Sequence, residues 1–147
     1  MDTGNLTQSE LIKIIRESRS IAVVGLSANP NRDSFLVAAY LQRVGYRIIP
    51  VNPFVAEVLG EKAYPTLKEI PPNIPIDIVD VFRRSEEVPQ IVQEAVSLKN
   101  PPRLIWLQLG ADNKEAAEYS RNNGIPLVMH ACLRVEHARL MKGEQLE

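Results

Sequence analysis

Residues 20–26 of the chain, Ser20-Ile-Ala-Val-Val-Gly-Leu26, form an almost continuous apolar run rich in β-branched side chains. Such a run is typical of a strand buried on both faces, as in a parallel sheet that helices cover on both sides. Apolar runs of similar length recur four more times, at residues 46–51, 76–82, 103–107 and 126–130. The sequence therefore predicts a parallel sheet of about five strands.

Amphipathic stretches alternate with these runs and predict helices that connect one strand to the next. They cover residues 34–44, 85–98 and 112–123, and a last helix is expected to begin near Cys132. Gly45 and Gly124 follow two of these stretches, as is common where a helix ends. Ser85 stands directly before Glu86 and Glu87, which suggests that Ser85 is the N-cap of the helix over 85–98.

One further helix is predicted ahead of the first strand, within an N-terminal extension of residues 1–19. The residues Thr7-Gln-Ser-Glu10 have the form of a capping box, and Leu11, Ile14 and Ile15 follow at helical spacing. The sequence leaves open whether this helix packs on the sheet or on a partner.

Strands that alternate with helices predict a doubly wound, Rossmann-like α/β fold with helices on both faces of the sheet, because parallel crossovers are right-handed. We expect the strand order 3-2-1-4-5 and a single domain over residues 1–147. Pro50 lies inside the second apolar run and has no N–H to donate, which favours a position at an edge or a strand end. Residues 52–75 hold five prolines and predict irregular structure with at most one helical turn, at 66–69.

Composition and charge exclude several classes of protein. The chain has 147 residues, of which 45% are hydrophobic and 24% charged, as in an ordinary soluble globular protein. Its formal net charge of −1 argues against a nucleic-acid-binding surface, and no apolar run approaches the roughly 20 residues that span a membrane. No signal-peptide pattern is visible at the start, and the single cysteine, Cys132, cannot form an internal disulfide. We therefore expect a cytoplasmic protein.

Ligands of doubly wound sheets bind beyond the carboxyl ends of the strands, where the strand order reverses, here expected between the first and fourth strands. The loop after the first strand begins with Gly25, which allows a sharp turn, and leads into a helix that starts near Ser34. Because a helix N-terminus favours anions, this loop predicts a phosphate site. We expect Arg32 and Arg83 to contact the ligand and Arg84 to be a solvated surface arginine.

The same loop departs from the fingerprint of nicotinamide dinucleotide sites. Ser27 and Pro30 occupy two positions at which that fingerprint has glycine. Asn52 and Pro53 follow the second strand, where such sites usually carry an acidic residue for the ribose. Both departures disfavour NAD(P), although the fold alone does not settle the ligand.

Five short motifs follow one another at the predicted strand ends. They are Gly-x-Ser-x-x-Pro-x-Arg-x-Ser at 25–34, Pro-Val-Asn-Pro at 50–53, Asp-x-Val-Asp-Val-Phe-Arg at 77–83, Trp-Leu-Gln-x-Gly at 106–110 and Cys-Leu-x-Val-Glu-His at 132–137. Together they resemble the small stand-alone coenzyme A-binding domain proteins, which are related to the CoA-binding domain of the succinyl-CoA synthetase alpha subunit. The resemblance extends over about residues 20–140.

This resemblance implies a crevice that binds CoA or an acyl-CoA. By the resemblance, the first loop would cradle the pyrophosphate through Gly25, Ser27, Pro30 and Arg32. Asn52-Pro53 and Phe82-Arg83 would flank the adenosine, and residues 108–110 would line the path of the pantetheine. The ligand-binding residues that we expect are Gly25, Ser27, Pro30, Arg32, Ser34, Asn52, Pro53, Phe82, Arg83, Gln108, Leu109, Gly110 and Cys132.

The segment around Cys132 supports more than one interpretation. His130 and Ala131 stand where the family often has a polar or acidic residue followed by arginine, so no role of that arginine is carried over. Cys132, near a helix N-terminus, is either a small buried residue or faces the CoA thiol, which would permit a mixed disulfide. His130, Cys132, Glu136 and His137 match no established zinc spacing, and we expect no metal site. Glu136 and His137 are expected to cap or salt-link the last helix.

We therefore expect a CoA-binding protein without catalysis of its own. No set of nucleophile, base and orienting group is visible, and the length leaves no room for the nucleotide-grasping domain of a synthetase. The alternative is a small NAD(P)- or nucleotide-dependent enzyme, or a subunit of one, that uses Cys132 as its nucleophile. The sequence leaves open whether the chain pairs with a protein partner or with a second copy.

Overall fold

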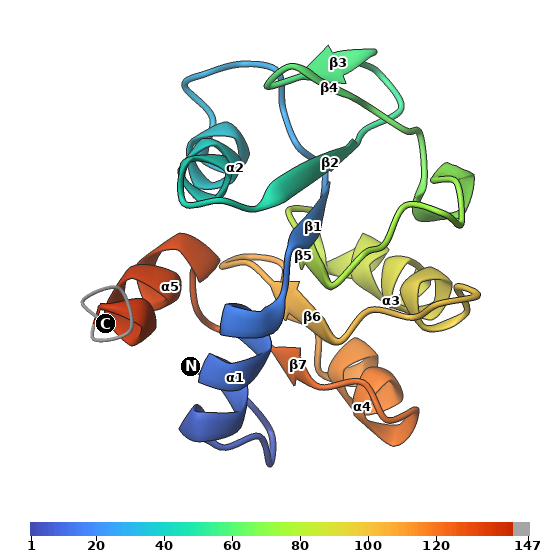
Figure 1. Ribbon diagram of the computed structural model, residues 1–147. Helices are drawn as coiled ribbons and strands as arrows, with labels where there is room; N and C mark the ends of the chain where they lie inside the picture. Colours follow the sequence, from blue (N-terminus) through green and yellow to red (C-terminus); the bar gives the residue numbers. More distant parts are fainter. Residues whose placement is uncertain (143–147) are drawn as a thin grey trace.

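The computed structural model describes residues 1–142 of the chain and has a parallel sheet at its centre (Figure 1). The sheet contains five strands in the order β2-β1-β5-β6-β7. Their bounds are β1 (Ser20–Val24), β2 (Arg47–Val51), β5 (Ile78–Val81), β6 (Leu104–Leu107) and β7 (Leu127–Val128). The predicted α/β class and the number of strands are confirmed.

The predicted strand order, 3-2-1-4-5, is wrong. The third strand of the sheet along the chain, β5, pairs with β1, with Ile21 opposite Ile78, and so the order along the chain is 2-1-3-4-5. This order places β2 at the edge of the sheet, where Pro50 lies opposite Val23. An edge position suits Pro50, since a strand between two neighbours needs N–H donors on both sides. The strand order therefore reverses between β1 and β5, and not between the first and fourth strands.

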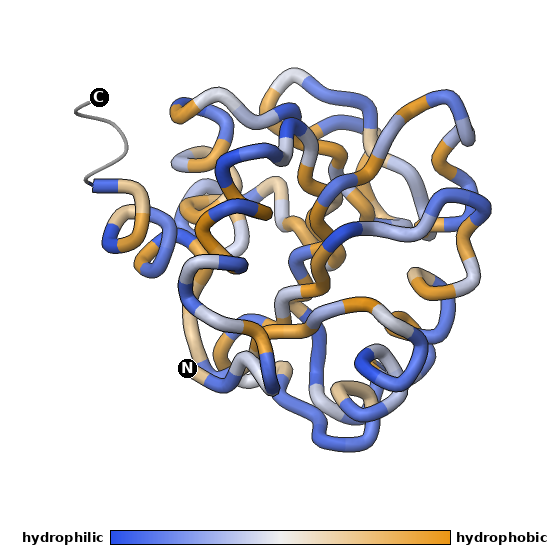
Figure 2. Tube along the Cα trace, turned by 60° about the horizontal axis from the view of Figure 1, so that its bottom comes forward, coloured by the Kyte–Doolittle hydropathy of each residue, from blue (hydrophilic) through white to orange (hydrophobic). Residues whose placement is uncertain are grey.

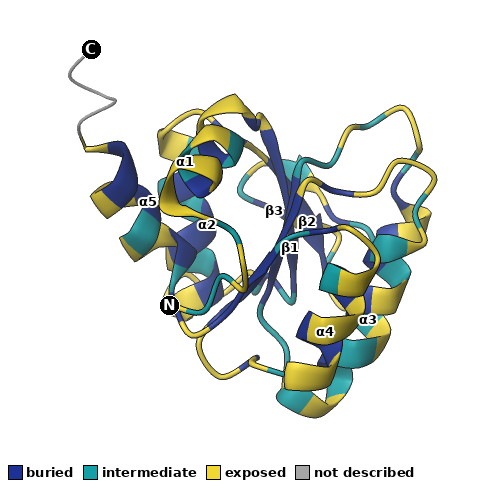
Figure 3. Ribbon diagram, turned by 90° about the horizontal axis from the view of Figure 1, so that it is seen from below, coloured by how far each residue is buried: buried dark blue, intermediate teal, exposed yellow. Residues whose placement is uncertain are grey.

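Five helices cover the two faces of the sheet. Their bounds are α1 (Gln8–Glu17), α2 (Asp33–Arg43), α3 (Val88–Val96), α4 (Lys114–Asn122) and α5 (Leu133–Met141). Helices α1, α2 and α5 pack on one face, and α3 and α4 pack on the other (Figure 3). Hydrophobic residues follow the central strands, whereas the peripheral loops are mostly hydrophilic (Figure 2). No helix within residues 1–142 has the length and apolar character needed to cross a bilayer.

The N-terminal helix packs on the sheet, a point that the sequence left open. Leu11 and Ile15 of α1 are buried in the same core cluster as Trp106 of β6. The predicted capping box is present: the Glu10 N–H donates to Thr7 Oγ1 over 3.2 Å, and the Thr7 N–H donates to Glu10 Oε1 over 2.9 Å. The cap satisfies N–H groups that the first helical turn leaves unpaired.

Two local predictions fail between β2 and α3. Ser85 does not cap a helix: residues Ser85–Glu87 form a 3₁₀ turn, η2, and α3 begins at Val88. Pro89 near the start of α3 accounts for the later start, because proline lacks the N–H that a more interior position would need. The Ser85 hydroxyl donates instead to the Asp112 carbonyl oxygen over 2.6 Å.

The segment of residues 52–75 contains a short hairpin that the sequence did not predict. Strands β3 (Glu57–Val58) and β4 (Glu61–Lys62) pair antiparallel around Leu59 and Gly60, whose φ angles are +56° and +76°. Two positive φ values are typical of a type I′ turn, but leucine is a rare residue for it. The single helical turn predicted at 66–69 is confirmed as the 3₁₀ turn η1 (Leu67–Glu69).

Candidate functional site

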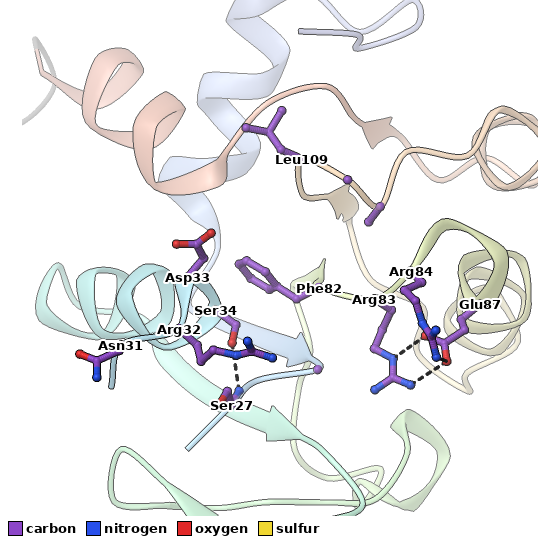
Figure 4. Close-up of a pocket in the computed structure, with 13 residues that line it drawn as sticks. Ser27, Asn31, Arg32, Asp33, Ser34, Phe82, Arg83, Arg84, Glu87 and Leu109 are labelled. Carbon is purple, nitrogen blue, oxygen red and sulfur yellow. Dashed lines mark hydrogen bonds and ion pairs between the residues drawn. The ribbon is translucent and has the colours of Figure 1, made fainter. Parts of the chain in front are cut away.

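The loops that follow β1, β5 and β6 surround a crevice with a volume of about 660 Å³ at the carboxyl ends of the strands (Figure 4). It lies at the point where the strand order reverses, which is the usual ligand position in such sheets. Eight of the residues expected from the sequence line it: Gly25, Ser27, Arg32, Ser34, Phe82, Arg83, Leu109 and Gly110. The structure thus brings three separate sequence motifs to one cavity.

Gly25 allows the first loop to pass close to the end of β5. Its φ is +85°, and a Cβ atom at this position would lie 2.2 Å from the Phe82 carbonyl oxygen. Two hydrogen bonds hold the chain here: the Gly25 N–H donates to the Val51 carbonyl oxygen and the Phe82 N–H to the Val24 carbonyl oxygen, each over 2.8 Å. A side chain at residue 25 would have to displace backbone, so the crevice depends on glycine.

The loop between Gly25 and α2 is held by its own polar side chains. The Ser27 N–H donates to the buried Ser34 hydroxyl over 3.0 Å, and the Asn29 N–H donates to Ser27 Oγ over 3.0 Å. No side chain of the described residues caps the first turn of α2, for which Arg32 is the N-cap residue. The uncapped N–H groups and the helix dipole make this end of α2 favourable for an anion.

Two arginines reach into the crevice from opposite walls (Figure 4). Arg32 forms no ion pair with any residue in the described part of the chain. Arg83, in contrast, donates two hydrogen bonds to Glu87, from Nε to Oε2 over 3.0 Å and from Nη2 to Oε1 over 2.9 Å. The hydrogen bonds from the Arg83 side chain lower the pKa of the Glu87 carboxyl. Arg84 is 79% exposed, in agreement with the expected solvated arginine, but it also lines the crevice, and its Nη2 lies 4.0 Å from Glu87 Oε1.

One end of the crevice is apolar. Phe82 and Ala111 line it, and Leu109 beside them is 67% exposed. Asp33 points away from Ser27 and Ser34 (Figure 4). The crevice therefore combines arginines and N–H groups with the apolar surface of Phe82 and Leu109, which suits a ligand with an anionic part and an apolar arm, although the carboxylates of Asp33 and Glu87 also line it.

Five of the expected residues do not line this crevice: Pro30, Asn52, Pro53, Gln108 and Cys132. Asn52 holds the loops, because its Nδ2 donates to the Leu26 carbonyl oxygen and its Oδ1 accepts from the Phe54 N–H. Gln108 is buried, and its Oε1 accepts the Leu133 N–H over 2.8 Å. Cys132 is the half-buried N-cap residue of α5 and packs against the core.

Pro53 lines a second, smaller cavity of about 230 Å³. This cavity shares three wall residues with the crevice, namely Gly25, Arg83 and Glu87. Its other walls are mainly apolar and come from the ends of β1 and β2, the segment around η1, and α3. The two cavities therefore form adjoining parts of one site.

Five residues that line the crevice were not among the expected ligand-binding residues: Asn31, Asp33, Arg84, Glu87 and Ala111. Asn31 and Asp33 lie inside the predicted loop, so their position beside Arg32 could have suggested them. Glu87 is four residues after Arg83, and residues at this spacing can form an ion pair only if the residues between them are helical.

A buried carboxyl group lies beneath the site and was also missed. Asp80 of β5 is 0% exposed, and neither of its side-chain oxygens has a hydrogen-bond partner among residues 1–142. It lies opposite Val23 and Trp106 in the neighbouring strands. Burial raises the pKa of Asp80 well above its ordinary value, which favours the neutral acid.

The segment from His130 to His137 does not form a cluster of metal ligands. No three His, Cys, Asp or Glu side chains within residues 1–142 are placed to hold a metal ion. His137 is buried, its Nδ1 lies 2.8 Å from the Tyr40 hydroxyl, and burial lowers its pKa. Glu136 pairs with Arg139 over 2.6 Å, so the expected salt link within α5 involves Glu136 and not His137.

The fold and the crevice define a doubly wound α/β protein with a crevice at the point where the strand order reverses. The chain belongs to a coenzyme A-binding family, because the family model described as "CoA binding domain" matches residues 19–138. The resemblance inferred from the five motifs is confirmed.

Three relatives illustrate the extent of the similarity. The chain is 44% identical over 134 residues to the uncharacterised protein YneT of Bacillus subtilis, which covers 91% of this chain and 96% of that protein. A solved structure of a hypothetical protein from Pyrococcus horikoshii is 34% identical with a TM-score of 0.86, covering 96% of this chain and 99% of that one. The chain is also 28% identical over 107 residues to acetate–CoA ligase [ADP-forming] II of Archaeoglobus fulgidus. That match covers 70% of this chain but only 16% of the ligase.

Proposed function

We propose that this chain binds coenzyme A or an acyl-CoA in the crevice, as one CoA-binding unit over residues 1–147, and that the proposal concerns binding alone. The observation that carries it is Arg32, a cation without an ion pair among residues 1–142, at the uncapped start of the 11-residue helix α2. A diphosphate is the part of CoA that such a helix end and such a cation would bind.

The two adjoining cavities suggest how the ligand would lie. The mainly apolar cavity beside Pro53 would take the adenine ring, and the diphosphate would pass over Gly25 to the N-terminus of α2. The pantetheine arm would then follow Phe82 and Leu109 along the apolar end of the crevice. This path keeps the positions that the sequence motifs imply for the first loop, Pro53 and Leu109, but it moves Phe82 from the adenosine to the pantetheine arm.

Cys132 stays part of this proposal, at the thiol end of the path. The hydrogen bond from the Leu133 N–H to Gln108 ties the start of α5 to the loop that carries Leu109 and Gly110. A CoA thiol that followed this loop would approach Cys132. Protection of Cys132 from alkylation by bound CoA is the expected result, and unchanged alkylation kinetics would count against this placement.

Calorimetric titration with CoA, dephospho-CoA, NAD and ATP tests the proposal. We expect CoA to bind most tightly and Arg32→Ala to weaken it by about tenfold or more, since a hydrogen bond to a charged group contributes about 1.5–3 kcal/mol. Arg47→Ala is the matched control, because Arg47 is exposed at the opposite end of the sheet, where β2 begins. Equal, weak binding of all four compounds would refute the proposal, and tightest binding of NAD would favour the dinucleotide alternative.

A further inference from the structure

Arg83 and Glu87 form part of the wall that the crevice shares with the smaller cavity. Any ligand that extends from one cavity into the other must pass this pair. Both side chains are about one-third exposed, at 34% for Arg83 and 32% for Glu87, so they are accessible to a ligand.

The geometry of the pair is bidentate. Arg83 uses its Nε and one terminal nitrogen, Nη2, to donate to the two carboxylate oxygens of Glu87, over 3.0 and 2.9 Å. Phosphate groups bind arginine through the same fork of parallel N–H donors. The Glu87 carboxylate therefore occupies the edge of Arg83 that a phosphate would use, and it also neutralises the positive charge.

We propose that Glu87 limits the affinity of this site for anions, because a ligand phosphate must compete with the Glu87 carboxylate for the Arg83 guanidinium. The inference rests on the proposed function, in that CoA supplies the phosphate groups. Glu87 is then a specificity-determining residue, because ligands whose phosphates cannot displace it from Arg83 bind more weakly. Arg32, which has no such competitor within residues 1–142, remains fully available to the ligand.

The charges around the pair agree with this assignment. The Arg83 hydrogen bonds keep the pKa of Glu87 low, so Glu87 is an anion over the ordinary pH range. Arg84 is the weaker partner of Glu87, because its side chain is 79% exposed and its Nη2 lies 4.0 Å from Glu87 Oε1, compared with 2.9 Å for Nη2 of Arg83. The Arg83 guanidinium is thus the nearest cation to the Glu87 carboxylate and the one to which it is hydrogen-bonded.

The test titrates inorganic pyrophosphate and CoA, separately, into the wild-type protein, Glu87→Gln, Glu86→Gln and Arg83→Ala. Glutamine keeps the shape of Glu87 and removes its charge, so we expect Glu87→Gln to bind both probes about tenfold more tightly. Glu86→Gln makes the same change of net charge one residue away, at a side chain that is 71% exposed and lines neither cavity. We expect Glu86→Gln to change binding by less than about twofold.

The double variant Arg83→Ala/Glu87→Gln shows whether the gain acts through Arg83. The inference requires that most of the gain disappear when Arg83 is absent, because Glu87 then keeps only the more distant Arg84, whose Nη2 lies 4.0 Å from Glu87 Oε1. A gain of equal size without Arg83 would overturn it, since the effect would then be a general change of charge. Unchanged or weaker binding by Glu87→Gln would also overturn it and would make Glu87 a residue that positions Arg83. Circular dichroism of each variant reports whether it folds.

The two probes separate this inference from the proposed function. Tighter binding of pyrophosphate by Glu87→Gln, without binding of CoA to any variant, would support the inference and refute the CoA proposal. Binding of CoA to the wild-type protein, without a gain in Glu87→Gln, would refute the inference alone. Failure of both probes to bind to any variant would refute both.

Discussion

Asp80→Asn is the substitution that tests the buried carboxyl group beneath the site. Asp80 is fully buried and has no hydrogen-bond partner in the part of the chain that the structure describes, and burial raises its pKa well above the ordinary value of 3.8. At pH values above this ordinary pKa, Asp80 loses its proton in the unfolded chain but keeps it in the folded protein. The folded state then binds more protons than the unfolded state, so the free energy of unfolding falls as the pH rises.

The size of this effect follows from the number of protons involved. One proton that only the folded state retains gives a slope of about 1.4 kcal/mol per pH unit, from the ordinary pKa up to the raised one. Asparagine has nearly the same shape and does not ionise, so Asp80→Asn removes this slope. The variant should therefore gain stability relative to the wild-type protein by about 1.4 kcal/mol for each pH unit within that window.

Urea unfolding at a series of pH values from about 4.5 to 7.5 measures this difference. Asp112→Asn is the control, because it makes the same chemical change at an exposed position. A difference between wild type and Asp80→Asn that stays constant over the whole series would refute the reasoning. Asp80 would then be ionised in the folded protein, or partnered there.

Two further substitutions test the other buried titratable group and the loop at the site. Below the ordinary His pKa of 6.5, the unfolded chain protonates His137, whereas burial keeps His137 neutral in the folded protein. The wild-type protein therefore loses stability as the pH falls, and His137→Gln should remove this loss. Thermal unfolding between about pH 5 and 7.5 measures this, and a pH-independent difference would contradict it. Gly25→Ala should abolish CoA binding and destabilise the protein more than Gly124→Ala. Both glycines have positive φ, but an added Cβ meets the Phe82 carbonyl oxygen only at Gly25 and has nothing within 4 Å at Gly124. Equal losses of stability in urea unfolding, with binding retained, would contradict the proposed close approach.

The strands and helices could be predicted because their signals are local. Apolar runs and amphipathic periods within a few residues mark each element, and the capping box at Thr7 and Glu10 does the same for α1. The order of the strands is a long-range property, since it depends on which strand pairs with β1. Only Pro50 carried a local indication of it, because a proline in β2 favours the edge position that the structure shows.

For the candidate site, too, local signals could be predicted from the sequence and long-range ones could not. The loops after β1, β5 and β6 could be located because the carboxyl ends of parallel strands meet at one edge of the sheet. The partner of Arg83 could not be inferred, because the sequence predicted Ser85 to be a helix N-cap. The structure instead has the 3₁₀ turn η2, which brings Glu87 close to Arg83. Asp80 had one signal, a carboxyl group inside an otherwise apolar run, but the sequence does not show whether such a group finds a partner.

Asp80 and His137 also explain why the variants, and not the wild-type protein alone, must be measured. Both groups favour their neutral forms in the fold, but Asp80 makes stability fall with rising pH whereas His137 makes it rise. Where the two pH windows overlap, their slopes cancel in the wild-type protein. A wild-type stability that does not change with pH would therefore be the sum of two opposed effects. On unfolding, Asp80 releases a proton and His137 takes one up. Each single substitution removes one of them and leaves the other visible.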